Sequence, residues 1–167
     1  MRSLYLVRHA KSSWDSPELS DHQRPLNKRG KKDAPKMGKL LRERNELPDL
    51  MISSTAKRAF STAKRIAEEL GYKIKDIEKN EMLYMADTNE YYNIIRKAPK
   101  KVYKLMLFSH NYGITYFANN ISNSNIDNIP TCGVVRIDFE IDSWKDIENQ
   151  KGNLIYFEYP KKYPDGI

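Results

Sequence analysis

At 167 residues, with 40% hydrophobic and 31% charged side chains, the chain has the size and composition of one soluble globular domain. Lys and Arg number 29 against 22 Asp and Glu, and the net charge of +7 favours an acidic or phosphorylated partner. Basic residues alternate with acidic ones along the helix-like segments, which is typical of a solvated face and argues against a nucleic-acid-binding protein.

The predicted compartment is the cytoplasm. No stretch approaches the roughly 18 consecutive apolar residues that a membrane-spanning helix needs. No hydrophobic signal region precedes the first strand-like segment. The single cysteine, Cys132, excludes an internal disulfide and fits a reducing environment. Its sequence neighbours offer no base, so we interpret it as a structural thiol.

Apolar runs typical of buried strands alternate with helix-like segments along the chain. Asp33 and Ser54 are the expected caps of the first two helices, with Pro35 in the first turn of the former. The polar segment 12–29 shows no apolar periodicity, and so long a loop in a compact domain is usually functional. The predicted strands are 4–7, 48–53, 72–78, 104–109, 134–140 and 153–159; the predicted helices are 33–45, 54–70, 88–96 and 113–120, with a short helix within 142–150.

Strands that alternate with helices predict an α/β protein, a three-layer α/β/α sandwich around a mostly parallel central sheet. We found no linker, internal repeat or composition change that would divide the chain. Residues 1–160 are therefore expected to form a single domain, and residues 161–167 a loose C-terminal tail.

Arginine and histidine residues, whose side chains can bind an anion, follow three of the predicted buried strands. The first strand runs into Arg8 and His9, the second is followed within a few residues by Arg58, and the third runs into His110. Ligands of open α/β sheets bind at the carboxyl ends of the strands. If these strands are neighbours, two arginines and two histidines converge on one pocket that suits an anion, and phosphate above all.

These segments resemble, in order and at fitting spacing, the sequence blocks of the histidine phosphatase superfamily. Ala10, in place of the usual glycine, and the short length resemble the SixA-type phosphohistidine phosphatase branch in particular. The resemblance implies a phosphoglycerate mutase-like fold without an inserted lid domain. The matching blocks are Arg8-His9-Ala10-Lys11, the segments 24–30 (RPLNKRG), 53–59 (SSTAKRA) and 109–113 (SHNYG), and the closing segment 129–134 (IPTCGV).

The resemblance also implies roles for individual residues. His9 matches the nucleophile that attacks phosphorus and becomes a covalent phosphohistidine. Arg8 and Arg58 match the arginines that bind the phosphoryl oxygens, and His110 matches the second histidine, which stabilises the transition state. The resemblance implies no metal and no other cofactor.

Further candidates are less specific. Ser12 and Arg24 are candidate substrate-binding residues, but Arg24 could instead anchor the loop through a carboxylate. Asn111 occupies the position where one branch of the superfamily carries its general acid, and Glu81 roughly matches the acid of another branch. A site without a clearly placed general acid would suit phosphohistidine as the substrate, because imidazole is a better leaving group than an alkoxide.

The expected function is that of a metal-independent phosphatase with a covalent phosphohistidine intermediate. Its expected partner is a phosphorylated substrate, in particular a histidine-phosphorylated protein, with no membrane involved. One alternative is a small-molecule phosphomonoesterase or mutase of the same superfamily. Another is a non-catalytic phosphate-binding adaptor, and binding to nucleic acid is the least favoured interpretation.

Overall fold

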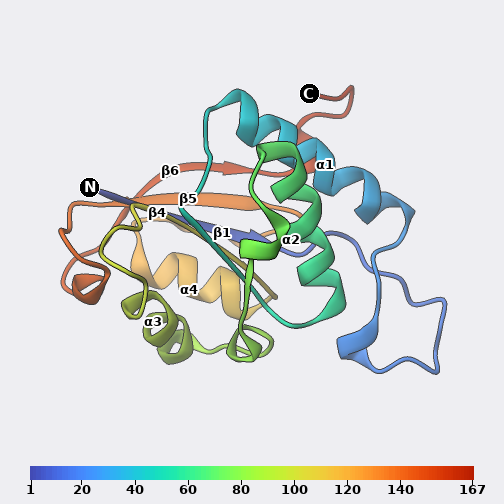
Figure 1. The fold of residues 1–167 in the computed structure, drawn as a ribbon, viewed down its shortest axis with the longest axis horizontal. Helices are drawn as coiled ribbons and strands as arrows, with labels where there is room; N and C mark the ends of the chain where they lie inside the picture. Colours follow the sequence, from blue (N-terminus) through green and yellow to red (C-terminus); the bar gives the residue numbers. More distant parts are fainter.

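Six strands form one mixed sheet in the computed structural model, which describes residues 1–167 (Figure 1). The strand order is β3-β2-β4-β1-β5-β6. The first four strands of this order run parallel, whereas β5 is antiparallel to β1 and β6 is antiparallel to β5. The predicted mostly parallel sheet is thus confirmed. The strands are β1 (Arg2–Arg8), β2 (Leu50–Ser53), β3 (Glu78–Lys79), β4 (Lys104–Ser109), β5 (Val134–Phe139) and β6 (Asn153–Glu158).

Helices cover both faces of the sheet, so the fold is the expected α/β/α sandwich, with no inserted lid domain. Helices α1 (Lys28–Glu43) and α2 (Lys57–Leu70) pack on one face, and α3 (Thr88–Arg96) and α4 (Gly113–Ile121) pack on the other (Figure 1). Alternate residues of the central strand β4 serve the two cores: Met106 and Phe108 face α1 and α2, and Leu105 and Leu107 face α3 and α4. None of the helices is long and apolar enough to cross a membrane.

Three predicted boundaries are wrong. Helix α1 begins at Lys28 because Asn27 caps it by accepting a hydrogen bond from the backbone nitrogen of Gly30 (2.9 Å), and Pro35 lies inside the helix. Ser54 does not cap α2, which begins after Ala56 without a side-chain cap. The peripheral strand expected over 72–78 shortens to β3, since a 3-10 helix occupies residues 74–76.

The long polar loop before α1 is fastened at its base. Ser13 donates a backbone hydrogen bond to the oxygen of Pro25 (2.8 Å), and Asn27 donates one to the oxygen of Lys11 (3.0 Å). Gly30 is required there, because a Cβ at this position would lie 2.1 Å from the oxygen of Lys11. The loop between these contacts carries a short 3-10 helix, residues 21–23, to the carboxyl edge of the sheet.

The chain end also has contacts. Lys36 of α1 donates a hydrogen bond to the backbone oxygen of Pro160 (3.0 Å), and the hydroxyl of Tyr163 donates one to Glu158 (2.6 Å). Residues 160–163 are therefore held against α1 and the end of β6.

Candidate active site

The ends of β1 and β4 bring His9 and His110 together. The two strands are neighbours in the sheet with Arg8 opposite Ser109, and the backbone nitrogen of His9 donates to the oxygen of Ser109 (3.2 Å). The centroids of the two imidazole rings lie 5.2 Å apart. Both residues are buried, with exposed fractions of 8% and 9%. The predicted neighbourhood of these strands is confirmed.

The hydrogen bonds of His9 select one tautomer of its ring. Nδ1 lies 2.7 Å from the backbone oxygen of Ala10, which can only accept, so Nδ1 carries the proton in the neutral ring. Nε2 is left with a free lone pair. Burial, together with the nearby charges of Arg58 and Arg8, lowers the pKa of His9 from 6.5 to about 3. The ring is therefore neutral and nucleophilic at physiological pH.

His110 has one occupied and one free ring nitrogen. Its Nε2 lies 2.7 Å from the hydroxyl oxygen of Ser54, which follows β2, and its Nδ1 is buried with no hydrogen-bond partner. Burial and the proximity of His9 and Arg58 lower the pKa of His110 to about 3. A buried polar nitrogen without a partner is unfavourable unless a ligand supplies one.

Arg8 and Arg58 supply positive charge on either side of the histidines. Arg8 donates through Nη1 to the oxygen of Ile129 (2.9 Å), while its Nε is buried without a partner. Burial and the nearby charge of Arg58 lower the pKa of Arg8. Arg58 lies in the first turn of α2 with an exposed fraction of 6%. The half-buried Arg8 at the end of β1 and the buried Arg58 at the amino terminus of α2 are two neighbouring cations, which favour a bound anion.

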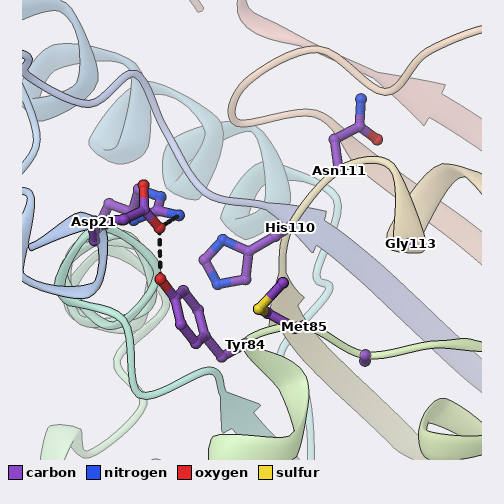
Figure 2. A pocket seen from close by; sticks show the side chains of 8 residues that line it. Asp21, Tyr84, Met85, His110, Asn111 and Gly113 are labelled. Atoms are coloured by element: carbon purple, nitrogen blue, oxygen red, sulfur yellow. Dashed lines mark hydrogen bonds and ion pairs between the residues drawn. The ribbon is translucent and has the colours of Figure 1, made fainter.

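Asp21, which the sequence analysis did not single out, occupies the same site. Arg58 donates to its backbone oxygen (2.6 Å) and to its Oδ2 (3.0 Å), and Arg24 donates to its Oδ1 (2.8 Å). The hydroxyl of Tyr84 donates to Oδ2 at 2.5 Å (Figure 2). Burial raises the pKa of the Asp21 carboxyl, but the hydrogen bonds from Tyr84, Arg24 and Arg58 outweigh it and hold the pKa well below its usual range.

Tyr84 connects the loop before α1 to His110 at the end of β4. Its ring centroid lies 5.4 Å from that of His110 and 4.8 Å from that of His22, in edge-to-face geometry in both cases. His22 is held in turn by Thr55, with Nε2 2.8 Å from the hydroxyl oxygen. All three histidines of the chain therefore lie at this edge of the sheet.

A cavity of about 540 Å³ opens beside His110. Its walls come from the loop before α1, from α2, and from the segments that precede α3 and α4. Figure 2 shows Tyr84 and His110 side by side beneath the Asp21 carboxylate. His9 does not line this cavity, but its ring lies against that of His110. The lining residues are Asp21, Arg58, Tyr84, Met85, Ala86, His110, Asn111 and Gly113.

Neither candidate position for a general acid places a carboxyl group in the cavity. The side chain of Asn111 points away from His110 (Figure 2), donating to Asn128 and accepting from Thr115. Glu81 begins a short 3-10 helix, is exposed, and is absent from the lining residues. The carboxylate that reaches the site comes instead from Asp21.

Arg24 is mainly a loop anchor. It donates to the backbone oxygen of Ser13 (3.0 Å) and to the buried hydroxyl of Ser12, and its guanidinium carbon lies 3.3 Å from the ring centroid of Trp14. It reaches the cavity through Asp21, and its charge also helps to lower the pKa of His9. Ser12 likewise points to Arg24, so both side chains shape the loop that carries Asp21.

The fold and this constellation define a class of phosphoryl-transfer enzyme, and comparison with known sequences agrees. Residues 4–108 match the sequence profile of the histidine phosphatase superfamily (branch 1), and the chain belongs to that superfamily. Within it, the chain resembles the SixA type in fold.

Three known proteins illustrate the similarity. An uncharacterised chloroplastic protein of Arabidopsis thaliana is 33% identical over 153 residues, which cover 87% of this chain and 70% of that protein. A protein from Agrobacterium tumefaciens, assigned as the phosphohistidine phosphatase SixA, superimposes with a TM-score of 0.81 and 28% identity, covering 95% of this chain and 98% of that one. The protein histidine phosphatase SixA complexed with tungstate shares the fold, with a TM-score of 0.82, 16% identity and coverage of 96% and 98%.

Proposed function

We propose that the protein is a metal-independent phosphatase that removes the phosphoryl group from phosphohistidine in a protein, through a covalent phosphohistidine on His9. The observation that carries the proposal is the hydrogen bond from His9 Nδ1 to the oxygen of Ala10 (2.7 Å), which leaves Nε2 free to attack. The free nitrogens of His110 and Arg8 beside it supply unused donors for a phosphoryl group.

The reaction takes two steps. In the first, Nε2 of His9 attacks phosphorus, the bond between phosphorus and the leaving group breaks, and its electron pair departs with the leaving group. Arg8, Arg58 and His110 bind the three equatorial oxygens as charge redistributes. In the second step, water attacks phosphorus, and the electron pair of the phosphorus–nitrogen bond returns to Nε2. Phosphate leaves, and His9 is neutral again.

The lack of a protonated carboxyl group in the cavity supports a phosphoramidate as the substrate. The carboxylate that lines the cavity, Asp21, has a lowered pKa and is ionised at neutral pH, so it holds no proton to give. Phosphate monoesters of alcohols need such a proton, because an alkoxide is a poor leaving group. An imidazole leaving group needs none when its ring is already protonated.

Exposed apolar side chains around the cavity support a protein as the substrate. We call Trp14, Met85 and Tyr112 the apolar rim; their exposed fractions are 72%, 83% and 73%. Met85 lines the cavity, Tyr112 lies between two lining residues, and Trp14 packs on Arg24 next to Asp21. Apolar groups gathered on a polar surface are typical of sites that contact another macromolecule.

The experiment compares the wild type with His9→Ala on three substrates: a histidine-phosphorylated phosphotransfer domain, sugar phosphates and p-nitrophenyl phosphate. We expect the phosphoprotein to have the highest kcat/KM, with and without a metal chelator. The ³²P-labelled substrate should leave an acid-labile label on the denatured wild type and none on His9→Ala, with circular dichroism confirming that the variant folds.

Each alternative predicts a different result. A label retained by His9→Ala contradicts the proposed nucleophile. A higher kcat/KM for sugar phosphates favours the small-molecule phosphomonoesterase or mutase. Binding of phosphate without turnover of any substrate favours the non-catalytic adaptor.

A further inference from the structure

An anionic side chain in a phosphate pocket requires an explanation. Asp21 contributes the sole carboxylate among the lining residues, and its side chain is 49% exposed although its partner Arg58 is buried. A carboxylate repels a bound phosphoryl group, so it is unfavourable for phosphate binding as such. Its three side-chain partners hold it ionised at a fixed place in the cavity wall.

Asp21 does not have to leave when a phosphoryl group binds. A guanidinium has five N–H donors, and Arg58 uses one on Nη1 and one on Nη2 for Asp21. The donors that remain can bind phosphoryl oxygens while the ion pair persists. Asp21 and the phosphoryl group are therefore neighbours on the same guanidinium.

The position of His9 determines on which side the leaving group lies. His9 is 8% exposed, its ring lies against that of His110, and it is not among the residues that line the cavity. In phosphoryl transfer the attacking and leaving atoms are roughly in line through phosphorus. Because His9 lies outside the cavity lining, we place the leaving group on the opposite side of phosphorus, in the open cavity whose wall carries Asp21.

We propose that Asp21 is a specificity-determining residue whose carboxylate accepts a hydrogen bond from the unphosphorylated ring nitrogen of the substrate phosphohistidine, favouring the protonated ring. The inference rests on the function proposed above and names one side chain that determines the substrate class. A carboxylate attracts an imidazolium cation and repels a departing alkoxide or phenolate. Asp21 therefore selects phosphoramidates against phosphate monoesters.

The chemistry balances without a proton transfer. The substrate ring enters with a proton on its unphosphorylated nitrogen, which faces Asp21. The phosphorus–nitrogen bond breaks, its electron pair stays on the released ring nitrogen, and the ring leaves as neutral imidazole with that same proton. The bond formed to His9 Nε2 turns its ring into a phosphoimidazolium, whose Nδ1 proton faces the oxygen of Ala10. The positive charge thus passes from the substrate ring to His9.

The test measures kcat/KM for phosphoimidazole and for p-nitrophenyl phosphate across pH in four proteins: the wild type, Asp21→Asn, Asp21→Glu and Glu18→Gln. Glu18 is an exposed acid of the same loop with no side-chain hydrogen bond, so its variant is a matched charge control. For Asp21→Asn we expect a loss of about tenfold or more with phosphoimidazole, and a higher value with p-nitrophenyl phosphate, because the repulsion of its departing phenolate is removed.

The pH profile separates this role from a merely structural one. In the wild type Asp21 keeps the substrate ring protonated, so in Asp21→Asn the alkaline limb for phosphoimidazole should move to lower pH. Asp21→Glu should restore part of the activity, and Glu18→Gln should behave as the wild type. Equal losses with both substrates, with an unmoved pH profile, would show that Asp21 only positions the arginines and would overturn the inference.

The proposed function fails in a different way. A wild type that hydrolyses p-nitrophenyl phosphate but neither phosphoimidazole nor a histidine-phosphorylated protein overturns the proposed function and this inference with it. A wild type that hydrolyses phosphoimidazole while Asp21→Asn does so equally well overturns the inference alone.

Discussion

The backbone of Ala10 binds the proposed nucleophile on one side and helix α2 on the other. Its oxygen accepts from Nδ1 of His9 (2.7 Å), and its nitrogen donates to the hydroxyl oxygen of Thr62 (2.9 Å). The Thr62 hydroxyl in turn donates to the backbone oxygen of Arg58 (2.7 Å). One short chain of hydrogen bonds therefore sets the tautomer of His9 and fixes its place relative to Arg58.

Replacing Thr62 tests this chain. Thr62 is fully buried, and Thr62→Val keeps its shape while leaving the backbone nitrogen of Ala10 without an acceptor. We expect a loss of about 1–3 kcal/mol in the free energy of unfolding, together with a lower kcat because His9 is less firmly placed. Urea unfolding and steady-state kinetics measure the two effects. Thr62→Ser keeps the hydroxyl and should retain most of both; equal behaviour of the two variants would contradict the role of the hydrogen bond.

The stability of the unliganded protein should fall on mild acidification. Burial lowers the pKa of both His9 and His110 from 6.5 to about 3, so between these values the unfolded chain binds more protons than the folded one. The stabilisation is complete above about pH 6.5 and is lost as the pH falls toward 3. From pH 7.5 to 5.5 we expect a loss of about 1.4 kcal/mol per histidine.

Urea unfolding at the two pH values measures this loss, in buffers without phosphate. His110→Asn removes one of the two groups and should show roughly half the pH dependence. A stability that stays constant, or rises, on acidification would contradict the burial of two neutral imidazoles.

The parts of the site that follow strands could be predicted from the sequence, and the parts on irregular segments could not. Arg8, His9 and His110 end short apolar runs whose carboxyl ends must meet at one edge of a parallel sheet. Asp21 lies in a short 3-10 helix and Tyr84 directly follows another, neither segment shows periodicity, and their contact joins residues 63 positions apart. The one signal for Asp21 was the alternative in which Arg24 anchors the loop through a carboxylate.

The predicted helix starts were wrong for a related reason, because several local sequence signals compete. Pro35 with Asp33 has the composition of a helix start, but Pro35 is tolerated inside α1, where the cap formed by Asn27 and Gly30 takes precedence. What decides between them is the close approach of Gly30 to the oxygen of Lys11. That contact joins two segments of the fold and has no local sequence signature.

Glu81 provides a direct test of whether a general acid operates. Its side chain is exposed and lies outside the cavity lining, so Glu81→Gln should leave kcat/KM within about twofold of the wild type on phosphoimidazole and on p-nitrophenyl phosphate. Glu78→Gln, another exposed acid on the neighbouring strand β3, is the matched control. A loss of tenfold or more confined to Glu81→Gln would restore Glu81 as the acid and would favour a phosphomonoester substrate.

The apolar rim should matter for a protein substrate and not for a small one. Met85 and Tyr112 flank the cavity with most of their surface exposed, and neither donates a side-chain hydrogen bond to the histidines or arginines of the site. The double variant Met85→Ser and Tyr112→Ser should raise KM for a histidine-phosphorylated phosphotransfer domain about thirtyfold, since each buried apolar side chain contributes on the order of 1 kcal/mol to an interface. Its kcat/KM for p-nitrophenyl phosphate should stay near that of the wild type.

The control is Ile155→Ser, which changes an exposed apolar residue on the edge strand β6 and should leave kcat/KM for both substrates unchanged. Equal losses on the two substrates would show that the apolar rim is part of the catalytic pocket. No loss on either substrate would favour a small phosphorylated molecule as the substrate.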